Sequence, residues 1–213
     1  MRLEPNHADI GLVAAVQEPT DLKLPEGTGF KWEEGLVLDL NTHYINFSAN
    51  STYLAEAYIN VYTQPTGTAK QEMKTELFAN LNIPIQNNEN MITHEQSLNF
   101  NFGDIHLWGM MGHTHKYGRD YKVYKRIGGQ KGEMIYDASC AQGIPGCVSP
   151  FFDYRHIPFR YFNDGFEPLT MNFSNGLIHE ASWLNDGPFS VNFGFTSDDE
   201  MMVLVIMYLD DIT

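Results

Sequence analysis

Short runs of alternating apolar and polar residues make up most of this chain, and glycine, asparagine, aspartate and proline separate them. The runs are rich in Val, Ile, Tyr, Phe and Trp, the residues that favour strands. The breaks recur roughly every 8–12 residues, and the sequence has neither a long stretch of helical periodicity nor an internal repeat. This pattern predicts an all-β fold, either a β-sandwich or a jelly roll.

Three runs predict strands of different kinds. Residues 35–48 alternate, with leucines on one face and His43 on the more polar face, and residues 53–65 predict a second strand of this sort. The run MMVLVIMYL, residues 201–209, is apolar on both faces. Such a run predicts a buried central strand.

Two histidines stand two residues apart in a segment that otherwise alternates like a strand, IHLWGMMGHTH. Residues i and i+2 of a strand point to the same face, so His113 and His115 can present two imidazoles side by side, with Thr114 pointing away. Two such imidazoles are half of a metal site. Regular alternation puts His106 and Trp108 on the opposite face from His113. A lone H-x-H is a weak signal, because surface histidines are common.

Composition narrows the function classes. The chain has 213 residues, enough for one large or two small domains, and 43% of them are hydrophobic, enough for a sizeable core. With 27 acidic against 13 basic residues the net charge is −14, which argues against binding nucleic acid or an anionic membrane surface. The sequence has no apolar run of about 18 residues that would span a membrane, and its N-terminus lacks the basic-then-apolar layout of a signal peptide.

The chain has two cysteines, Cys140 and Cys147, in the segment SCAQGIPGC. Turn-forming residues between them (Gly143, Pro145 and Gly146) would let the two sulfurs approach in a small loop. Spacing alone leaves both a disulfide and two free thiols open.

A methionine at the start of the buried C-terminal run adds a third candidate ligand. A methionine at such a place ordinarily packs in the core, but its thioether is also a soft ligand that suits Cu(I). Two imidazoles with one thioether make a poor structural zinc site, because zinc prefers thiolate, imidazole and carboxylate. His113 and His115 with a thioether from Met201 or Met202 therefore point to copper that cycles between Cu(I) and Cu(II).

Several stretches resemble the copper type II, ascorbate-dependent monooxygenases, the family of peptidylglycine α-hydroxylating monooxygenase and dopamine β-monooxygenase. GHTHKYGRDYKV is similar to the family's H-T-H-x-x-G-R strand, and FGFTSDDEMMVLVIMYL to its T-S-x-D-E-M strand. LVLDLNTHYINF resembles its L-x-x-H-Y-x-N strand, and GLIHEASWLND fits the strand and turn before the methionine strand. Together they span most of residues 30–213, in family order.

The resemblance implies a pair of jelly-roll domains, each binding one copper. We expect residues 1–66 to be the C-terminal part of a first copper-monooxygenase-like β domain, which is incomplete here. We expect residues 67–213 to be a second copper-binding jelly-roll domain.

By position, His113, His115 and Met201 match the ligands of the family's oxygen-activating copper, which makes them the expected catalytic residues. His43 matches one histidine of its electron-transfer copper. Met201 is preferred over Met202 because it directly follows the Asp-Glu pair of the motif. The family hydroxylates a substrate C–H with O2, and ascorbate supplies the electrons.

Three departures from the family pattern limit what the resemblance implies. The chain has no adjacent His-His pair, so the electron-transfer site lacks two of its family ligands. Met111 stands where the peptide-processing enzymes carry an arginine for the substrate carboxylate, which argues against a glycine-extended peptide. Met202 and Ala181 stand where the family has a cysteine pair, so that disulfide is absent.

We therefore expect a copper-dependent monooxygenase domain acting on a small-molecule or peptide substrate, with ascorbate as reductant, one expected copper site and a second in doubt. The alternative is a non-catalytic copper-binding or structural β-sandwich module of a secreted or cell-surface protein, which the incomplete electron-transfer site favours. For either, we expect an extracellular, periplasmic or secretory-pathway location, with no nucleic-acid partner and no membrane span.

Overall fold

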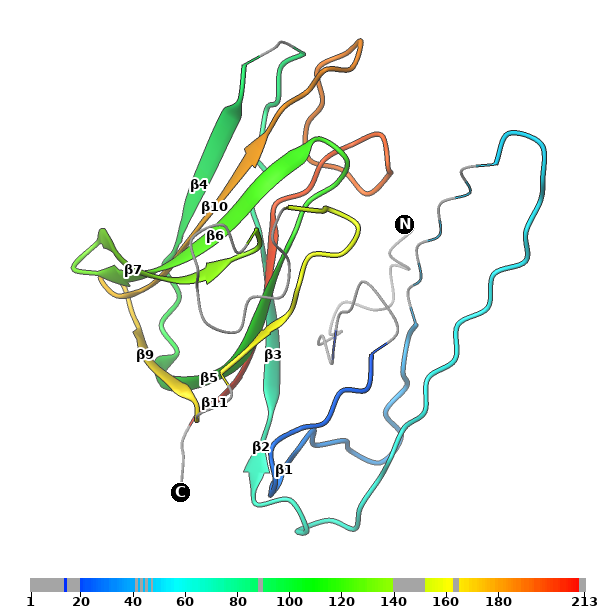
Figure 1. The fold of residues 1–213 in the computed structure, drawn as a ribbon. Helices are drawn as coiled ribbons and strands as arrows, with labels where there is room; N and C mark the ends of the chain where they lie inside the picture. Colours follow the sequence, from blue (N-terminus) through cyan, green and yellow to red (C-terminus); the bar gives the residue numbers. More distant parts are fainter. Residues whose placement is uncertain are drawn as a thin grey trace.

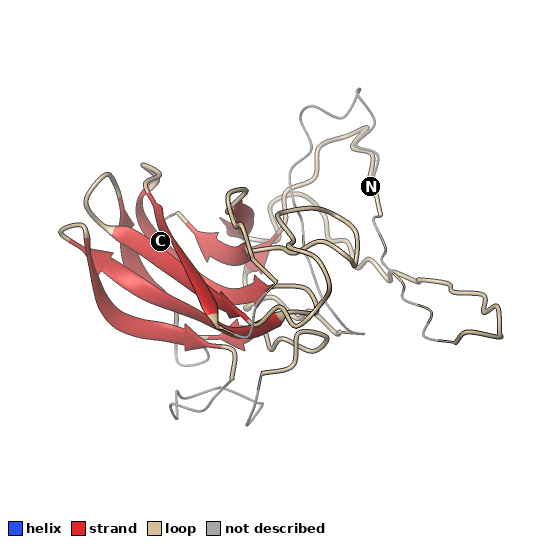
Figure 2. Cartoon of the chain, turned by 90° about the horizontal axis from the view of Figure 1, so that it is seen from above, coloured by secondary structure: helices blue, strands red, loops and turns tan. Residues whose placement is uncertain are grey.

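The computed structural model describes residues 14, 20–40, 42, 44, 46, 48–87, 90–139, 152–162 and 165–210. Among them the regular secondary structure is β-strand throughout, which confirms the all-β class, and no helix there could cross a membrane. His43, Cys140 and Cys147 lie outside the described residues. Figures 1 and 2 show the strands gathered in one body, with a long extended loop projecting from it.

Two sheets form this body, and the pairs within each are antiparallel. The first sheet has the order β4-β10-β6-β7 and contains β4 (Ile92–Leu98), β6 (Gly118–Ile127), β7 (Gln130–Asp137) and β10 (Gly176–Trp183). The second sheet has the order β3-β11-β5-β8, with β9 also paired to β5, and contains β3 (Lys74–Ala79), β5 (Gly103–His113), β8 (Arg160–Tyr161), β9 (Glu167–Met171) and β11 (Val203–Leu209). The jelly-roll connectivity stays a prediction.

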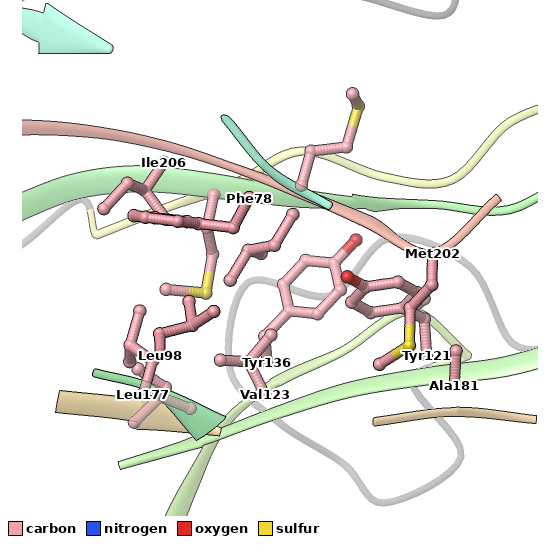
Figure 3. Packing of buried hydrophobic residues seen from close by; sticks show 14 of the residues in the cluster. Phe78, Leu98, Tyr121, Val123, Tyr136, Leu177, Ala181, Met202 and Ile206 are labelled. Carbon is pink, nitrogen blue, oxygen red and sulfur yellow. The ribbon is translucent and has the colours of Figure 1, made fainter. Parts of the chain in front are cut away.

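The main hydrophobic core lies between the two sheets (Figure 3). Alternation along each strand sends every second side chain into this space. Val123 and Leu177 enter it from the first sheet, and Phe78 and Ile206 enter it from the second. The sheets therefore pack as a sandwich around one shared core.

Strand β11 confirms the predicted buried central strand. It lies between β3 and β5, and all seven of its residues are buried. Its residues Leu204 and Ile206 face the main core, whereas Met207 and Leu209 belong to a second cluster on the outer face of the sheet. Because both faces are covered, both faces of the sequence are apolar.

Part of that outer cover comes from the N-terminal segment. Leu22, Leu24 and Phe30 pack onto the outer cluster. The short parallel pair of β1 (Thr28–Gly29) with β2 (Gln71–Glu72) adds backbone contacts next to this packing. The segments before and after the predicted boundary at residue 66 therefore contact each other. The division into two domains stays a prediction.

Strand β5 contains a β-bulge that simple alternation does not predict. Leu107 and Gly109 pair with consecutive residues of β11, which leaves Trp108 as the extra residue. After such an extra residue, each side chain of the strand points to the face opposite to the one that regular alternation assigns. Trp108 joins the outer cluster, and Gly109 lies on that same face because it pairs with Met207.

The bulge overturns one expectation about the histidines. Alternation placed His106 and His113 on opposite faces, but His106 pairs with Leu209 and His113 with Val203. Those two partners are six residues apart on β11, so they share a face, and the two histidines share it too. His106 nevertheless takes no part in the H-x-H site, because strand geometry separates the two residues by roughly 20 Å.

The two strands predicted over residues 35–48 and 53–65 do not form among the described residues. The described residues of both ranges are not paired into a sheet, and large side chains such as Leu54 and Tyr58 are exposed. Extended chain becomes a strand only when a neighbour satisfies its backbone groups, and a two-stranded ribbon alone is marginal. The sequence pattern identified the strand propensity but not the missing partner.

Candidate metal centre

The two histidines of the H-x-H motif lie together where β5 ends. His113 is the last residue of β5, and His115 lies in the turn that leads into β6, where its carbonyl accepts a hydrogen bond from Gly118 N at 3.1 Å. Their ring centroids are 5.2 Å apart, with the planes at 83°. His115 is buried and His113 is partly buried. The structure therefore brings two imidazoles together at one end of the second sheet.

Met201 lies at the same end and on the same face. His113 pairs directly with Val203, and residues opposite one another in an antiparallel pair share a face. Met201 packs in one cluster with Val203 and Val205, with Phe193 beside it. Two imidazoles and one thioether, contributed by residues about 90 positions apart in the chain, thus gather at the ends of the neighbouring strands β5 and β11.

Met202 belongs to a different environment. Its side chain is fully buried in the main core, in the region of Tyr121 and Ala181 (Figure 3). Its sulfur accepts a hydrogen bond from Asn80 Nδ2 at 3.6 Å. The two neighbouring methionines therefore divide between the sandwich core and the face that carries His113.

Glu200 is the residue that ties the histidine turn to the methionine strand. Its carboxylate is fully buried. Oε2 accepts hydrogen bonds from His115 N at 2.8 Å and from Trp183 Nε1 at 2.9 Å, with Met201 N at 3.3 Å, and Oε1 accepts one from Tyr117 N at 2.7 Å. One side chain thus ties the backbone of His115 and Tyr117 to that of Met201.

The electrostatics of Glu200 follow from this burial. Loss of solvation raises the pKa of its carboxyl, and the donated N–H bonds together with the nearby His115 oppose that rise. A cation bound near His115 would further favour the charged carboxylate. Both carboxyl oxygens accept N–H hydrogen bonds, an arrangement that suits the charged carboxylate.

The orientation of His115 is also fixed. Its Nδ1 lies 2.9 Å from the backbone oxygen of Asp199. Because a carbonyl oxygen only accepts hydrogen bonds, Nδ1 carries the proton, which leaves the lone pair of Nε2 directed away from Asp199. Metal-binding histidines commonly use one ring nitrogen in this manner and bind with the other.

Sequence reasoning missed a second buried polar chain, which lies in the sandwich core. Tyr121 Oη lies 2.6 Å from His179 Nδ1, and His179 Nε2 lies 2.7 Å from Gln96 Oε1. The Tyr121 ring also packs against Gly112, where any Cβ would overlap it. The sequence could have indicated that His179 is buried, because it lies two residues after Leu177 and therefore on the same face of the strand.

Neither the models of known protein families nor the sequences of curated proteins match this chain. The family resemblance therefore rests on the quoted motifs. Among the described residues, no group of three or more His, Cys, Asp or Glu side chains is placed to hold a metal ion. The set found here instead includes a thioether, and its two imidazoles and one sulfur fit the preferences of copper.

Proposed function

We propose that this chain is a copper-dependent monooxygenase domain in which His113, His115 and Met201 hold the copper that activates O2. The observation that carries the proposal is the gathering of two adjacent imidazoles and a methionine at the ends of β5 and β11. Copper held there would supply one-electron redox chemistry with O2 and ascorbate, and would hydroxylate a substrate C–H.

The protein's own groups have separable tasks in this proposal. His115 offers Nε2 because Asp199 O holds the proton on Nδ1. Glu200 holds the turn and the methionine strand together by accepting hydrogen bonds from four N–H groups. Burial of Val203 and Val205 beside Met201 limits access of water to the sulfur. Such supporting contacts orient the ligands and tune the metal.

Copper stoichiometry and turnover test the proposal. The purified chain should bind copper in both oxidation states, with a Cu(II) EPR signal whose nitrogen hyperfine structure disappears in a His113→Ala, His115→Ala double variant. Ascorbate should then drive O2 consumption. Two coppers per chain with turnover would mean that a second site forms as well, and absence of copper binding would refute any copper function.

A non-catalytic copper-binding module is the second candidate. The chain lacks the adjacent His-His pair that the electron-transfer site of the family uses. A module of this kind should bind one copper per chain and consume no O2 with ascorbate. The measurement described above therefore separates the two functions.

The two adjacent methionines give a sharper test of the ligand assignment. Met201→Ala should weaken Cu(I) binding at least about tenfold, since loss of even an outer-shell partner costs roughly 10–100-fold. Met202→Ala should leave Cu(I) affinity within about twofold but lower the free energy of unfolding by about 2–5 kcal/mol, because it empties a core position. Competition with a Cu(I) chelator and urea unfolding measure the two effects. Equal losses of Cu(I) affinity would show that the assignment is wrong.

A further inference from the structure

A cavity of about 410 Å³ opens on the outer face of the second sheet. Its walls include four aromatic side chains from three places in the chain: Trp108, Tyr161, Phe162 and Phe166. A volume of this size lies within the range of small-molecule sites, roughly 300–1,000 Å³. Nothing in the proposed copper chemistry uses this cavity.

The β-bulge of β5 and the N-terminal segment build the cavity. Trp108 faces outward at the bulge, and Gly109 after it pairs with the outward-facing Met207 and has no side chain to fill that face. Along residues 21–25, Leu22 and Leu24 pack onto the outer cluster, while the alternate residues line the cavity. The apolar side chains thus anchor the segment that carries the charged side chains.

The lining indicates the chemistry of a ligand. The rings of Trp108 and Tyr161 pack against each other with centroids 4.9 Å apart and planes at 54°, so an aromatic wall borders the cavity. Asp21 and Lys23 also line the cavity, where they form an exposed ion pair at 3.1 Å. Such a pair is weak in water and can exchange partners with a ligand charge.

We propose that this cavity binds a small planar aromatic molecule that carries one charged substituent. Its site is separate from the H-x-H end of the sheet, because Trp108 and His113 are five residues apart on β5, roughly 16 Å along a strand. The ring of Phe159 also lies over Gly109 between them. The inference therefore stands or fails independently of copper.

Fluorine NMR of the chain labelled with 5-fluorotryptophan tests this site. The chain has three tryptophans, and Trp→Phe variants assign their signals. The probes are 2-naphthoate and 2-naphthylmethylammonium, with decahydro-2-naphthoate as the non-aromatic analogue. We expect a saturable shift of the Trp108 signal with at least one naphthyl probe. The signal of Trp183, which is fully buried in the core, should stay in place.

Variants then locate the binding. Phe166→Leu keeps an apolar side chain but removes a ring of the wall, and should weaken the naphthyl probe about tenfold. Phe189→Leu, at an exposed phenylalanine, is the matched control and should not change the affinity. Asp21→Asn should lower the affinity for the ammonium probe only, or Lys23→Gln should lower the affinity for the carboxylate probe only.

Three results would overturn the proposal. The first is an unshifted Trp108 signal up to the solubility limit of both naphthyl probes. The second is an equal response to the saturated analogue, which would mean general hydrophobic adsorption. The third is an equal effect of Phe166→Leu and Phe189→Leu on the affinity.

Discussion

Glu200→Ala is expected to lower the free energy of unfolding by at least about 4 kcal/mol, a large share of the roughly 5–15 kcal/mol that holds a domain folded. Four N–H groups donate to its carboxylate, and each would lose its partner inside the protein. Leaving one buried donor unsatisfied costs about 1–3 kcal/mol. Water that enters the vacated space would satisfy some donors, so the estimate takes the lower end of that range.

Glu200→Gln separates geometry from hydrogen bonding. The amide has nearly the same shape, but its single oxygen can accept only at one of the two former oxygen positions. If that oxygen serves His115 N and Trp183 Nε1, the amide NH2 faces Tyr117 N, which is itself a donor. We therefore expect an intermediate loss of about 2 kcal/mol.

Urea unfolding followed by tryptophan fluorescence measures both variants. Glu133→Ala is the matched control, because Glu133 is an exposed carboxylate paired with Lys125 on the surface. It should change the free energy of unfolding by at most about 1 kcal/mol. A loss from Glu200→Ala no larger than that of the control would show that the four hydrogen bonds do not stabilise the turn.

Glu200 also shows how far sequence reasoning reached at the site. The candidate ligands were visible because H-x-H spacing and a methionine before an apolar run carry local signals. The role of Glu200 depends on contacts to residues from 17 to 85 positions away. Such a convergence has no signature in spacing, and only the resemblance drew attention to the Asp-Glu-Met stretch.

Some features of the fold likewise follow from the local sequence pattern, and others depend on residues far away in the chain. The buried character of residues 201–209 followed from an apolar pattern on both faces, and β11 is buried between its neighbours. Alternation had assigned His106 and His113 to opposite faces, but the bulge at Trp108 puts them on the same face. Alternation does not predict a bulge, because a bulge depends on the register of the partner strand. Residues 35–48 carry a strand pattern, but pairing depends on a neighbour that the pattern does not specify.

His179 is the second position with a large expected effect, and acid should reveal it. Its side chain is fully buried between Tyr121 and Gln96. Gln96 Oε1 accepts from Nε2, so Nδ1 is left to accept the Tyr121 hydroxyl proton, an arrangement that requires neutral imidazole. Burial lowers the pKa of His179 from 6.5 to about 3. Protonation in the folded state would both charge the core and remove the acceptor of Tyr121.

The sign of the pH effect follows from proton binding in the two states. Between pH 6.5 and about pH 3 the unfolded chain carries a proton on His179 that the folded chain excludes. Acid therefore favours unfolding in this window, and the contribution of His179 is constant above it. From this group alone the free energy of unfolding should fall by about 2 kcal/mol from pH 7 to pH 5, and by about 3 kcal/mol at pH 4.

His179→Gln isolates this contribution, because glutamine can accept from Tyr121 and donate to Gln96 but binds no proton in this range. The variant should be less stable than the wild type at pH 7, since its shape differs, yet its stability should fall by about 2 kcal/mol less between pH 7 and pH 5. His156→Gln removes an exposed histidine beside Asp153 and should leave the wild-type fall within about 1 kcal/mol. Urea unfolding at each pH gives the differences directly. If His179→Gln and the wild type lose the same stability, the buried imidazole is not excluding a proton, and the Tyr121–His179–Gln96 chain must tolerate a charge in the core.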